Sequence, residues 1–266
     1  MILDGKAIAN DIYEILAPQY AVLGKQVRLG IVVVGGDPVI ASFVRIKERA
    51  ATRLGVEFVK TELPESATTE EVLATIKQSA DTCDAVIPQL PMPKHVDFER
   101  VLASIPPEKD VDALNHTTPI EKRIVHEPVA LAVLELLDRG GVDVHDKYAV
   151  VVGAGRLVGL PSARMLEDRG AKVEIVTRKQ GSLDSLKDAD IIVSGTGVSE
   201  LINADMIKEG VALIDAGTSE LSKKVVGDAD PACASKCAVF TPVPGGVGPV
   251  AVAMIYKNLL ALVLYG

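Results

Sequence analysis

The sequence predicts an α/β protein of two domains: an N-terminal α/β domain and a Rossmann-type domain with a mainly parallel sheet. Three observations support this fold class. Helical and strand patterns alternate along the chain, which is typical of a parallel sheet covered by helices. A glycine-rich turn stands between an apolar strand and a helix at residues 149–161. The length of 266 residues also exceeds that of an ordinary single-core domain.

The first half of the chain contains three strand patterns separated by helical ones. Apolar spacing predicts a helix near residues 5–23, a helix over 39–55, and a helix that opens at Thr69-Glu70. Apolar runs predict strands at 27–34, 57–63 and 85–87, and a short helix follows Asp97. This order predicts βαβ units and therefore parallel strands.

The second half repeats the alternation after a connecting helix at 129–137, which Gly140-Gly141 ends. Strands are predicted at 148–152, 172–176, 191–193, 212–214 and 238–240. The last segment, 250–264, is helical and almost wholly apolar, so we expect it to be buried, packed back on the first domain. We find no internal repeat and no low-complexity tract.

Composition excludes several classes of protein. Hydrophobic residues make up 48% of the chain and charged residues 24%, as in soluble globular proteins, and we expect no membrane span. The N-terminus has acidic residues and no signal-peptide pattern, which predicts a cytoplasmic protein. A net charge of −8, with four Phe and five Tyr, makes a nucleic-acid partner a poor expectation.

The cysteines and histidines show no ligand spacing. The three cysteines are an odd number without CxxC pairs, which suits a reducing compartment and structural roles. The four histidines are scattered, without HExxH or a similar pattern. We therefore expect no metal site.

A lysine lies on the apolar face of the helix at 39–55. Helical spacing relates the apolar residues Ile40, Phe43, Val44, Ala50, Ala51 and Leu54, and Lys47 falls on the same face. The pattern alone leaves two interpretations open. The amine either reaches solvent from the edge of the stripe, or it lines a functional cleft.

The glycine-rich turn reads GAGRLVG, with Gly153, Ala154, Gly155 and Gly159 forming GxGxxxG in place of the usual GxGxxG. Glycines permit a tight turn and close backbone approach, and the helix N-terminus offers N–H groups to a pyrophosphate. The following strand ends in Thr177-Arg178-Lys179 and not in a carboxylate. Cations at this place favour the 2′-phosphate of NADP over NAD, although a solvated surface pair and a plain strand-to-helix turn remain alternatives.

Four further stretches carry a family resemblance: SFVRIK at 42–47, AVIPQLPMP at 85–93, PPEKDVDAL at 106–114 and TPVPGGVGPVAVAM at 241–254. In order and spacing they resemble the bifunctional methylenetetrahydrofolate dehydrogenase/methenyltetrahydrofolate cyclohydrolase family, nearly end to end. The resemblance implies oxidation of 5,10-methylenetetrahydrofolate with NADP and hydrolysis of the methenyl product to 10-formyltetrahydrofolate. It also implies a homodimer.

The resemblance further implies a domain division and a set of site residues. Residues 1–115 with the terminal helix 249–266 would form the folate-binding and catalytic domain, and 128–248 the NADP-binding domain. Lys47 would assist proton transfer, Gln89 would hold the lysine, and Asp112 would accept hydrogen bonds from the pterin. The implied substrate contacts are Phe43, Pro244, Gly245 and Gly246. The implied cofactor contacts are Gly153, Ala154, Gly155, Arg156, Gly159, Arg178 and Thr218.

Departures from the family pattern fall within this implied site. Phe43 stands in place of a tyrosine and lacks its hydroxyl, and Ala113 replaces the glycine that usually follows KDVD. The family's PCTPxG loop is HEPVA at 126–130, and Val250-Ala251 replaces Met-Thr. Two alternatives to the bifunctional enzyme therefore stay open. One is a dehydrogenase with weak or absent cyclohydrolase activity, and the other is a non-catalytic folate- or nucleotide-binding homologue.

Overall fold

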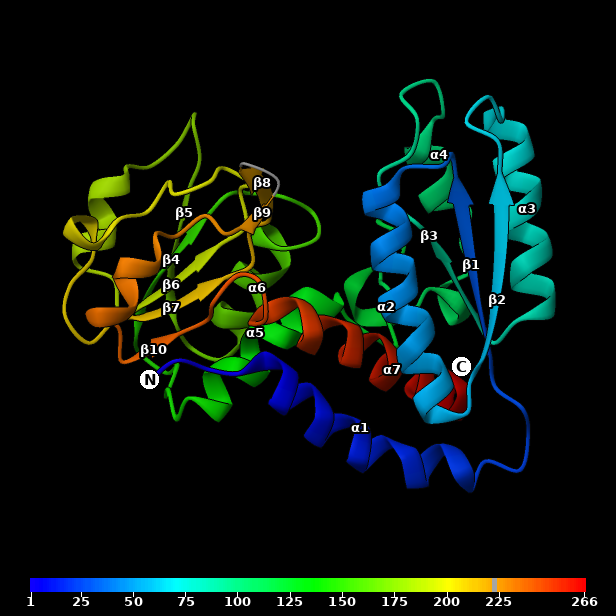
Figure 1. Cartoon of the computed structure of the whole chain (residues 1–266), viewed down its shortest axis with the longest axis horizontal. Helices are drawn as coiled ribbons and strands as arrows, with labels where there is room; N and C mark the ends of the chain where they lie inside the picture. The colour runs from blue at the N-terminus through cyan, green and yellow to red at the C-terminus, as the bar shows by residue number, and fades with distance from the viewer. Residues whose placement is uncertain (222–223) are drawn as a thin grey trace. The chain divides into compact units, whose positions relative to one another are not determined.

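The computed structural model describes residues 1–221 and 224–266, which form two compact units (Figure 1). The three-stranded unit comprises Asp11–Pro128 and Val252–Gly266, and the five-stranded unit comprises Met1–Asn10 and Val129–Ala251. Both contain parallel sheets, so the predicted α/β fold class is confirmed.

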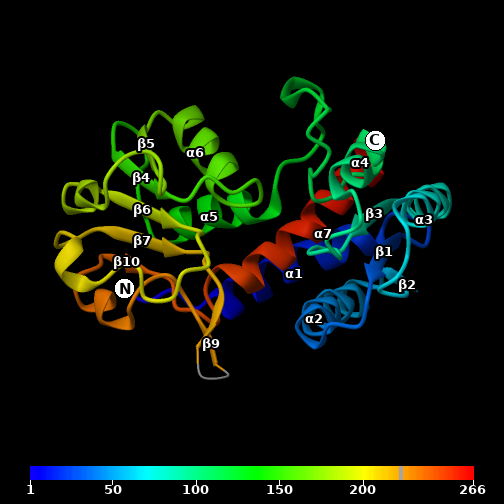
Figure 2. The same cartoon turned by 90° about the horizontal axis from the view of Figure 1, so that it is seen from above.

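The three-stranded unit is built on a parallel sheet of order β2-β1-β3, with β1 at Arg28–Val34, β2 at Glu57–Leu63 and β3 at Ala85–Pro88. Helix α2 (Pro38–Leu54) connects β1 to β2, and α3 (Thr69–Thr82) connects β2 to β3. These crossovers run in opposite directions along the sheet, and right-handed connections then place α2 and α3 on opposite faces (Figure 2). The short helix α4 (Phe98–Ala103) follows.

Burial explains why each of these strands takes its place. All positions of β1 after Arg28 are buried, as expected for a central parallel strand of β-branched residues. The edge strand β2 has no buried position. Helix α3 opens with a capping box, in which Thr68 accepts from the Glu71 amide and Glu71 accepts from the Thr68 amide. Its buried face packs on β1, β3 and α4, and this core contains Val34, Val72, Ile76, Val86, Val101 and Leu102.

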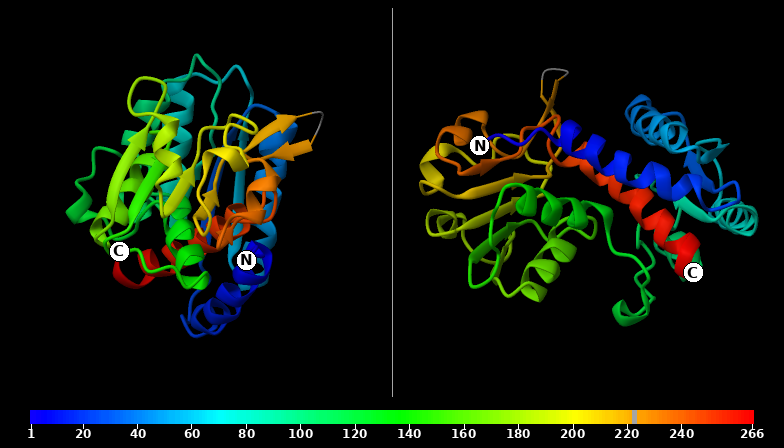
Figure 3. Two further views of the ribbon diagram at one scale, coloured as in Figure 1. Left: turned by 90° about the vertical axis from the view of Figure 1, so that its left-hand side faces the viewer. Right: turned by 90° about the horizontal axis from the view of Figure 1, so that it is seen from below.

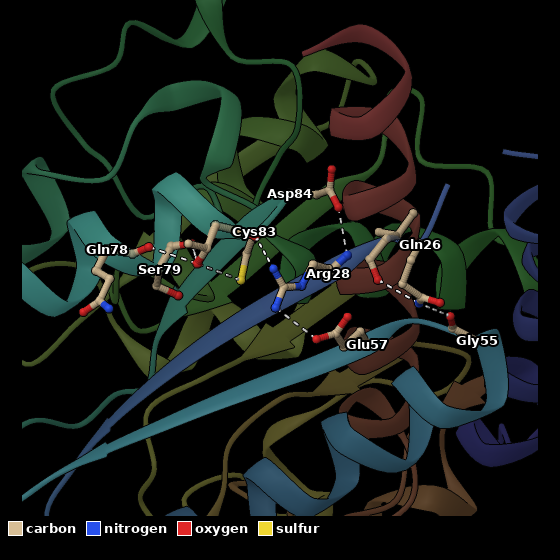
Figure 4. Close-up of polar contacts among 10 residues, drawn as sticks. Gln26, Arg28, Gly55, Glu57, Gln78, Ser79, Cys83 and Asp84 are labelled. Carbon is tan, nitrogen blue, oxygen red and sulfur yellow. Dashed lines mark hydrogen bonds and ion pairs between the residues drawn. The ribbon is translucent and has the colours of Figure 1, made fainter. Parts of the chain in front are cut away.

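Polar contacts join the amino ends of the three strands (Figure 4). The Arg28 amide donates to Asp84 at 2.8 Å, and its guanidinium donates to the Thr82 carbonyl at 2.9 Å and to Glu57 at 3.0 Å. Gly30 lies two residues after Arg28 in β1, where an added Cβ would stand 2.1 Å from the Ser79 hydroxyl. The close packing of α3 on β1 therefore requires a glycine at this position.

The five-stranded unit has a wholly parallel sheet of order β10-β7-β6-β4-β5 (Figure 2). Its strands are β4 (Tyr148–Val152), β5 (Lys172–Val176), β6 (Ile191–Ser194), β7 (Ala212–Asp215) and β10 (Val239–Phe240), and its helices include α5 (Pro128–Arg139) and α6 (Gly159–Asp168). From β5 the chain returns to the other side of β4 to form β6, so the strand order switches direction at β4. Ligands of open α/β sheets bind at the carboxyl ends of the strands beside such a switch.

Two short elements complete this unit. β8 (Ser219–Leu221) and β9 (Lys224–Val226) form an antiparallel pair. The N-terminal residues add to the sheet edge, because Ile2 bridges Phe240 and the Leu3 amide donates to the Phe240 carbonyl at 2.9 Å.

Two long helices each begin among residues of the five-stranded unit and end in the three-stranded one: α1 (Gly5–Ala21) and α7 (Val247–Tyr265). Their portions in the three-stranded unit lie side by side (Figure 3), and the Tyr20 hydroxyl donates to the Tyr256 carbonyl at 2.6 Å. Helix α7 is long and apolar enough to cross a membrane, yet more than half of its most apolar 18-residue stretch is buried inside the protein. Such burial fits a core helix.

The predicted elements are confirmed with small shifts of their ends. The strands at 57–63, 148–152 and 172–176 have the predicted bounds, and the terminal helix begins three residues earlier than predicted. The β8–β9 pair was not predicted. The described residues also contain five short 3₁₀ helices that were not predicted: η1 (Pro107–Lys109), η2 (Ile120–Lys122), η3 (Leu183–Lys187), η4 (Ala204–Met206) and η5 (Pro231–Ser235).

Candidate active site and dinucleotide site

Helix α2 brings Lys47 to Gln89, which directly follows β3. The Lys47 ammonium Nζ donates to Gln89 Oε1 at 3.0 Å, although the two residues lie 42 positions apart in sequence. Burial lowers the pKa of Lys47, and the negative charge of Asp112 opposes this change. A lysine with a lowered pKa exchanges its proton more readily near neutral pH than an exposed lysine does.

The Gln89 side chain is fixed on both sides. Its backbone amide donates to the Val32 carbonyl at 2.9 Å, which extends the β1–β3 ladder by one residue. Its side-chain nitrogen donates to the Leu90 carbonyl at 2.6 Å, so the side-chain oxygen is the group presented to Lys47. The residue is buried, which keeps this orientation out of competition with water.

Asp112 lies in a tight turn that Asp110 holds together. The Asp110 carboxylate accepts the backbone amides of Leu114 at 2.9 Å and Asn115 at 2.7 Å. Within this turn, Ala113 directly follows Asp112 and has a left-handed φ of 53°. Burial raises the pKa of Asp112, and the charge of Lys47 opposes this rise. Lys47 and Asp112 therefore act on each other electrostatically, and Lys47, Gln89 and Asp112 all belong to the three-stranded unit.

Phe43 lies one helical turn before Lys47, on the same side of α2. Ile40, Val44, Ala50, Ala51 and Leu54 of the expected apolar face are buried, whereas Phe43 is 46% exposed. The buried stripe is therefore narrower than the sequence indicates. Phe43 and the partly buried Lys47 form its accessible edge.

The glycine-rich turn joins β4 to α6 in the five-stranded unit. Gly153 has a φ of 101°, which is unfavourable for any residue with a Cβ. A Cβ on Gly159 would stand 2.0 Å from the Gly153 carbonyl oxygen, so the turn folds tightly back on the start of the helix. An added Cβ on Gly155 meets nothing within 4 Å, which leaves open space beside the backbone. This geometry fits a pyrophosphate at the N-terminus of α6.

The other expected cofactor residues lie at the same edge of the sheet. Ala154 and Arg156 are exposed in the turn after β4, Arg178 is exposed directly after β5, and Thr218 is exposed after β7. Because the strands are parallel, their carboxyl ends share one edge, beside the switch point. Pro244, Gly245 and Gly246, expected to contact substrate, belong to this unit. There the Gly5 amide donates to the Gly245 carbonyl at 2.9 Å.

Two buried aspartates that the sequence did not single out organise this edge. Asp228 accepts the Ser194 hydroxyl at 2.6 Å, the Thr196 amide at 2.6 Å and the Val198 amide at 3.0 Å. Asp215 accepts the amides of Gly217 at 2.9 Å and Ala229 at 2.8 Å. Burial raises the pKa of Asp215 to about 6, and the charge of Asp228 adds to the rise.

Reciprocal close packing accompanies this pair. A Cβ on Gly217 would stand 2.0 Å from Asp228 Oδ1, and one on Gly227 would stand 2.1 Å from Asp215 Oδ2. The loops after β6 and β7 are thus fixed by carboxylates and not by backbone pairing alone. The available sequence signal was a glycine two residues after the strand-end Asp215 and another directly before Asp228. Among residues 1–221 and 224–266, no group of three or more His, Cys, Asp or Glu side chains is arranged to hold a metal ion.

The parallel sheet, its switch point and the glycine cradle define a dinucleotide-binding α/β protein whose other unit carries a partly buried lysine. Comparison with known proteins identifies the family. Residues 3–112 match the model of the tetrahydrofolate dehydrogenase/cyclohydrolase catalytic domain, and residues 128–265 match that of the NAD(P)-binding domain. The chain belongs to the tetrahydrofolate dehydrogenase/cyclohydrolase family, and the resemblance seen in the sequence is confirmed.

Similar proteins cover nearly the whole chain. The Bifunctional protein FolD of a Nitratiruptor species is 39% identical over 97% of this chain and 96% of its own. The corresponding protein of Staphylococcus aureus is 37% identical over 97% and 95%. The Trypanosoma brucei methylenetetrahydrofolate dehydrogenase-cyclohydrolase, solved with NADP cofactor and inhibitor, has a TM-score of 0.93 at 33% identity, covering 99% of this chain and 97% of its own. The Campylobacter jejuni FolD structure has a TM-score of 0.91 at 32% identity, covering 99% and 98%.

Proposed function

We propose that this protein oxidises 5,10-methylenetetrahydrofolate with NADP and hydrolyses the resulting 5,10-methenyltetrahydrofolate to 10-formyltetrahydrofolate, in one-carbon metabolism. The observation that carries the proposal is the contact of the Lys47 ammonium with Gln89 at 3.0 Å, under the charge of Asp112. The three residues come from separate segments of the region that matches the family's catalytic domain. The similarity to bifunctional FolD proteins and to the solved structure of a methylenetetrahydrofolate dehydrogenase-cyclohydrolase supports both activities.

The side chains take defined roles in this proposal. Asp112 accepts hydrogen bonds from pterin N–H groups and orients the folate, while Phe43 offers an aromatic face to the ring. Bound NADP⁺ would supply the acceptor for the hydride that the methylene carbon loses as it becomes a methenyl cation. Lys47 then assists the attack of water on that carbon by proton transfer, and a ring C–N bond breaks to leave the formyl group on one nitrogen. Gln89 keeps the lysine aimed at this carbon.

The cofactor site rests on the glycine cradle and on Arg178. In the proposal, Gly153, Ala154, Gly155, Arg156 and Gly159 surround the pyrophosphate, Thr218 contacts the cofactor from β7, and Arg178 pairs with the 2′-phosphate. A guanidinium recognises a phosphate with two parallel hydrogen bonds, which favours NADP over NAD. Pro244, Gly245 and Gly246 contact the folate from a stiff backbone segment.

The remaining features of the proposal concern organisation. Residues 1–115 with 249–266 form the folate-binding and catalytic domain, and 128–248 the NADP-binding domain. The protein acts in the cytoplasm as a homodimer, without nucleic-acid or membrane partners. Sedimentation equilibrium of the purified chain tests the homodimer, because a mass near that of one chain of 28.1 kDa at micromolar concentration contradicts it.

A second candidate is a dehydrogenase with little or no cyclohydrolase activity. The observation that favours it is Phe43, an accessible side chain beside Lys47 that lacks a hydroxyl. A hydroxyl at that position could hydrogen-bond to water or to the lysine, and phenylalanine cannot. In this case the methenyl product accumulates and decays only at the uncatalysed rate.

One spectrophotometric experiment tests both candidates. Purified protein is mixed with methylenetetrahydrofolate and either NADP or NAD, and NADPH or NADH and the methenyl product are followed by absorbance. Turnover of the methenyl form above the uncatalysed rate supports the bifunctional enzyme. Absence of turnover with both cofactors refutes it, and calorimetry then asks whether the ligands bind without reaction.

Variants identify the residue responsible. Lys47→Met should lower the cyclohydrolase rate by about 10²- to 10⁴-fold, the usual worth of a positioned proton-transfer group. Lys60→Met is the matched control, since Lys60 pairs with Glu62 on the exposed strand β2 at 2.9 Å. Equal effects of the two changes would contradict the assignment of Lys47.

A further inference from the structure

Two buried polar side chains interrupt the apolar helix α7. Tyr256 is fully buried and Asn258 is 4% exposed, and the neighbouring leucines of the helix are buried as well. Burying a hydroxyl or an amide is unfavourable unless each finds a hydrogen-bond partner. Their partners therefore explain why these residues stand in the helix.

Tyr256 bonds to the backbone of the lysine. Its hydroxyl donates to the carbonyl oxygen of Lys47, in the middle of α2. This bond joins α7 to the turn of α2 from which the amine projects. The Tyr256 backbone carbonyl in turn accepts the Tyr20 hydroxyl of α1 at 2.6 Å, so the helix is also held from another side.

Asn258 bonds to the backbone beside the aspartate. Its side-chain nitrogen donates to the carbonyl of Val111 at 2.9 Å and to that of His126 at 2.7 Å. Val111 directly precedes Asp112, so the amide anchors the turn that carries the carboxylate. Both side-chain N–H groups are used on backbone acceptors.

The two anchors project from different sides of one rigid element. Residues two positions apart in an α-helix are rotated by about 200° around its axis. Tyr256 and Asn258 therefore reach in nearly opposite directions, one to α2 and the other to the turn at 110–115. The helix between them sets the distance between the two backbone segments, and all three elements belong to the three-stranded unit.

We propose that Tyr256 and Asn258 are positioning residues that fix the backbones of Lys47 and Asp112 relative to each other, so that α7 sets the spacing between the proton-transferring lysine and the aspartate that orients the folate. This inference rests on the proposed function for its catalytic meaning. It assigns to the terminal helix a role in the reaction, beyond filling the core. Neither side chain touches substrate in this scheme, and each acts through the residue that it anchors.

The state of the Lys47 amine reports on this arrangement. Gln89 holds the amine from the end of β3, the charge of Asp112 acts on it from the turn, and Tyr256 faces its backbone from α7. Burial raises the pKa of Tyr256, so its hydroxyl stays neutral and remains a donor. Since burial is the largest influence on the pKa of Lys47, loosening of α2 that exposes the amine moves this pKa upward.

The test compares Tyr256→Phe with Tyr148→Phe in the full-length protein. Each change removes one phenolic hydroxyl from a hydrogen bond, but only the first bond ends on Lys47, whereas Tyr148 donates to Glu174 in the five-stranded unit. Two quantities are measured: the cyclohydrolase rate, and the pH dependence of Lys47 acetylation by acetic anhydride, quantified by mass spectrometry. Thermal melting of both variants records the loss of stability that they share.

We expect Tyr256→Phe to lower the cyclohydrolase rate about tenfold, in line with the effect of small displacements on catalysis, and to move the acetylation midpoint of Lys47 to higher pH. Tyr148→Phe should change neither. Asn258→Leu, which keeps the branched shape but removes both N–H donors, should lower kcat/KM for methylenetetrahydrofolate by about tenfold through Asp112. If this variant does not fold, the Tyr256 comparison still decides.

Identical behaviour of the two Tyr→Phe variants in both measurements would overturn the inference and leave Tyr256 a core residue. This outcome is distinct from failure of the proposed function. A wild-type protein without turnover refutes the proposed function, while the acetylation midpoint of Lys47 still reports whether Tyr256 positions it.

Discussion

Asp110 provides a sharp prediction because its carboxylate both holds the Asp112 turn and has an altered acidity. Burial raises the pKa of Asp110 from 3.8 to about 6, although the amides of Asn115 and Leu114 and the charge of Arg123 act in the opposite direction. The folded protein therefore binds a proton at Asp110 more tightly than the unfolded chain does. The prediction concerns Asp110→Asn, which removes this titration.

The sign and size follow from linkage. Between about pH 4 and pH 6 the folded state holds more protons at this site than the unfolded state, so the free energy of unfolding falls as pH rises through this window. A shift of roughly two units, at ~1.4 kcal/mol per unit, makes the fall about 3 kcal/mol at most. Asp110→Asn also loses one backbone acceptor, which lowers stability by about 1–3 kcal/mol at every pH. Only the first effect depends on pH.

Hydrogen exchange read by mass spectrometry on peptides from β1 and β3 reports the stability of this unit without requiring that both units unfold together. We expect the stability advantage of the wild type over Asp110→Asn to shrink as pH rises from 4 to 7. Asp81→Asn, which removes a surface carboxylate paired with Lys77, is the control and should not alter the pH dependence. An advantage that stays constant or grows with pH would refute the reasoning.

Three further predictions concern packing and cofactor choice. Gly30→Ala should lower the free energy of unfolding in urea by about 1–3 kcal/mol, because the new methyl group occupies the place of the Ser79 hydroxyl. Adding Ser79→Ala to the same chain should restore most of the loss, and additive effects of the two changes on stability would contradict this reasoning. Gly159→Ala should weaken NADP binding at least tenfold in calorimetry, since the nearest backbone oxygen is 2.0 Å from the added Cβ; unchanged affinity would contradict the tight cradle. Arg178→Ser should raise KM for NADP about 10- to 100-fold and leave KM for NAD nearly unchanged; equal changes would argue against a phosphate contact.

The regular elements were predictable because their sequence signals are local. Apolar β-branched runs with polar or glycine ends mark 148–152 and 172–176, and the structure gives those strands the same bounds. The β8–β9 pair escaped prediction because three-residue strands leave too little room for an alternating pattern. The 3₁₀ helices contain three to five residues and are likewise too short to show a periodic pattern.

The candidate site was predictable only in part. The contact between Lys47 and Gln89 joins segments that no helical or strand period relates, so the family resemblance indicated it and the geometry then placed the two together. Aspartates in loops usually serve as turn or cap residues. In KDVD this ordinary role belongs to Asp110, which accepts two backbone amides, but nothing in the four letters distinguishes it from Asp112.

Residues that act through hydrogen bonds to distant backbone groups were not predictable at all. Asn258 reads as an exception in an apolar helix, and its value depends on two carbonyls more than a hundred residues away in sequence. Asp228 likewise collects donors from the loop after β6. Such side chains gain their roles from tertiary proximity, which periodicity does not encode.

The reciprocal packing of two glycines against two carboxylates has an evolutionary consequence. Gly217 lies against Asp228 and Gly227 against Asp215, so any side chain at either glycine meets an oxygen of the opposite aspartate. Removing either carboxylate first would instead leave buried backbone amides without a hydrogen-bond acceptor. A single substitution at any of these four residues is therefore unfavourable. We expect related proteins that share the fold of this unit to keep or lose the two glycines and the two aspartates together.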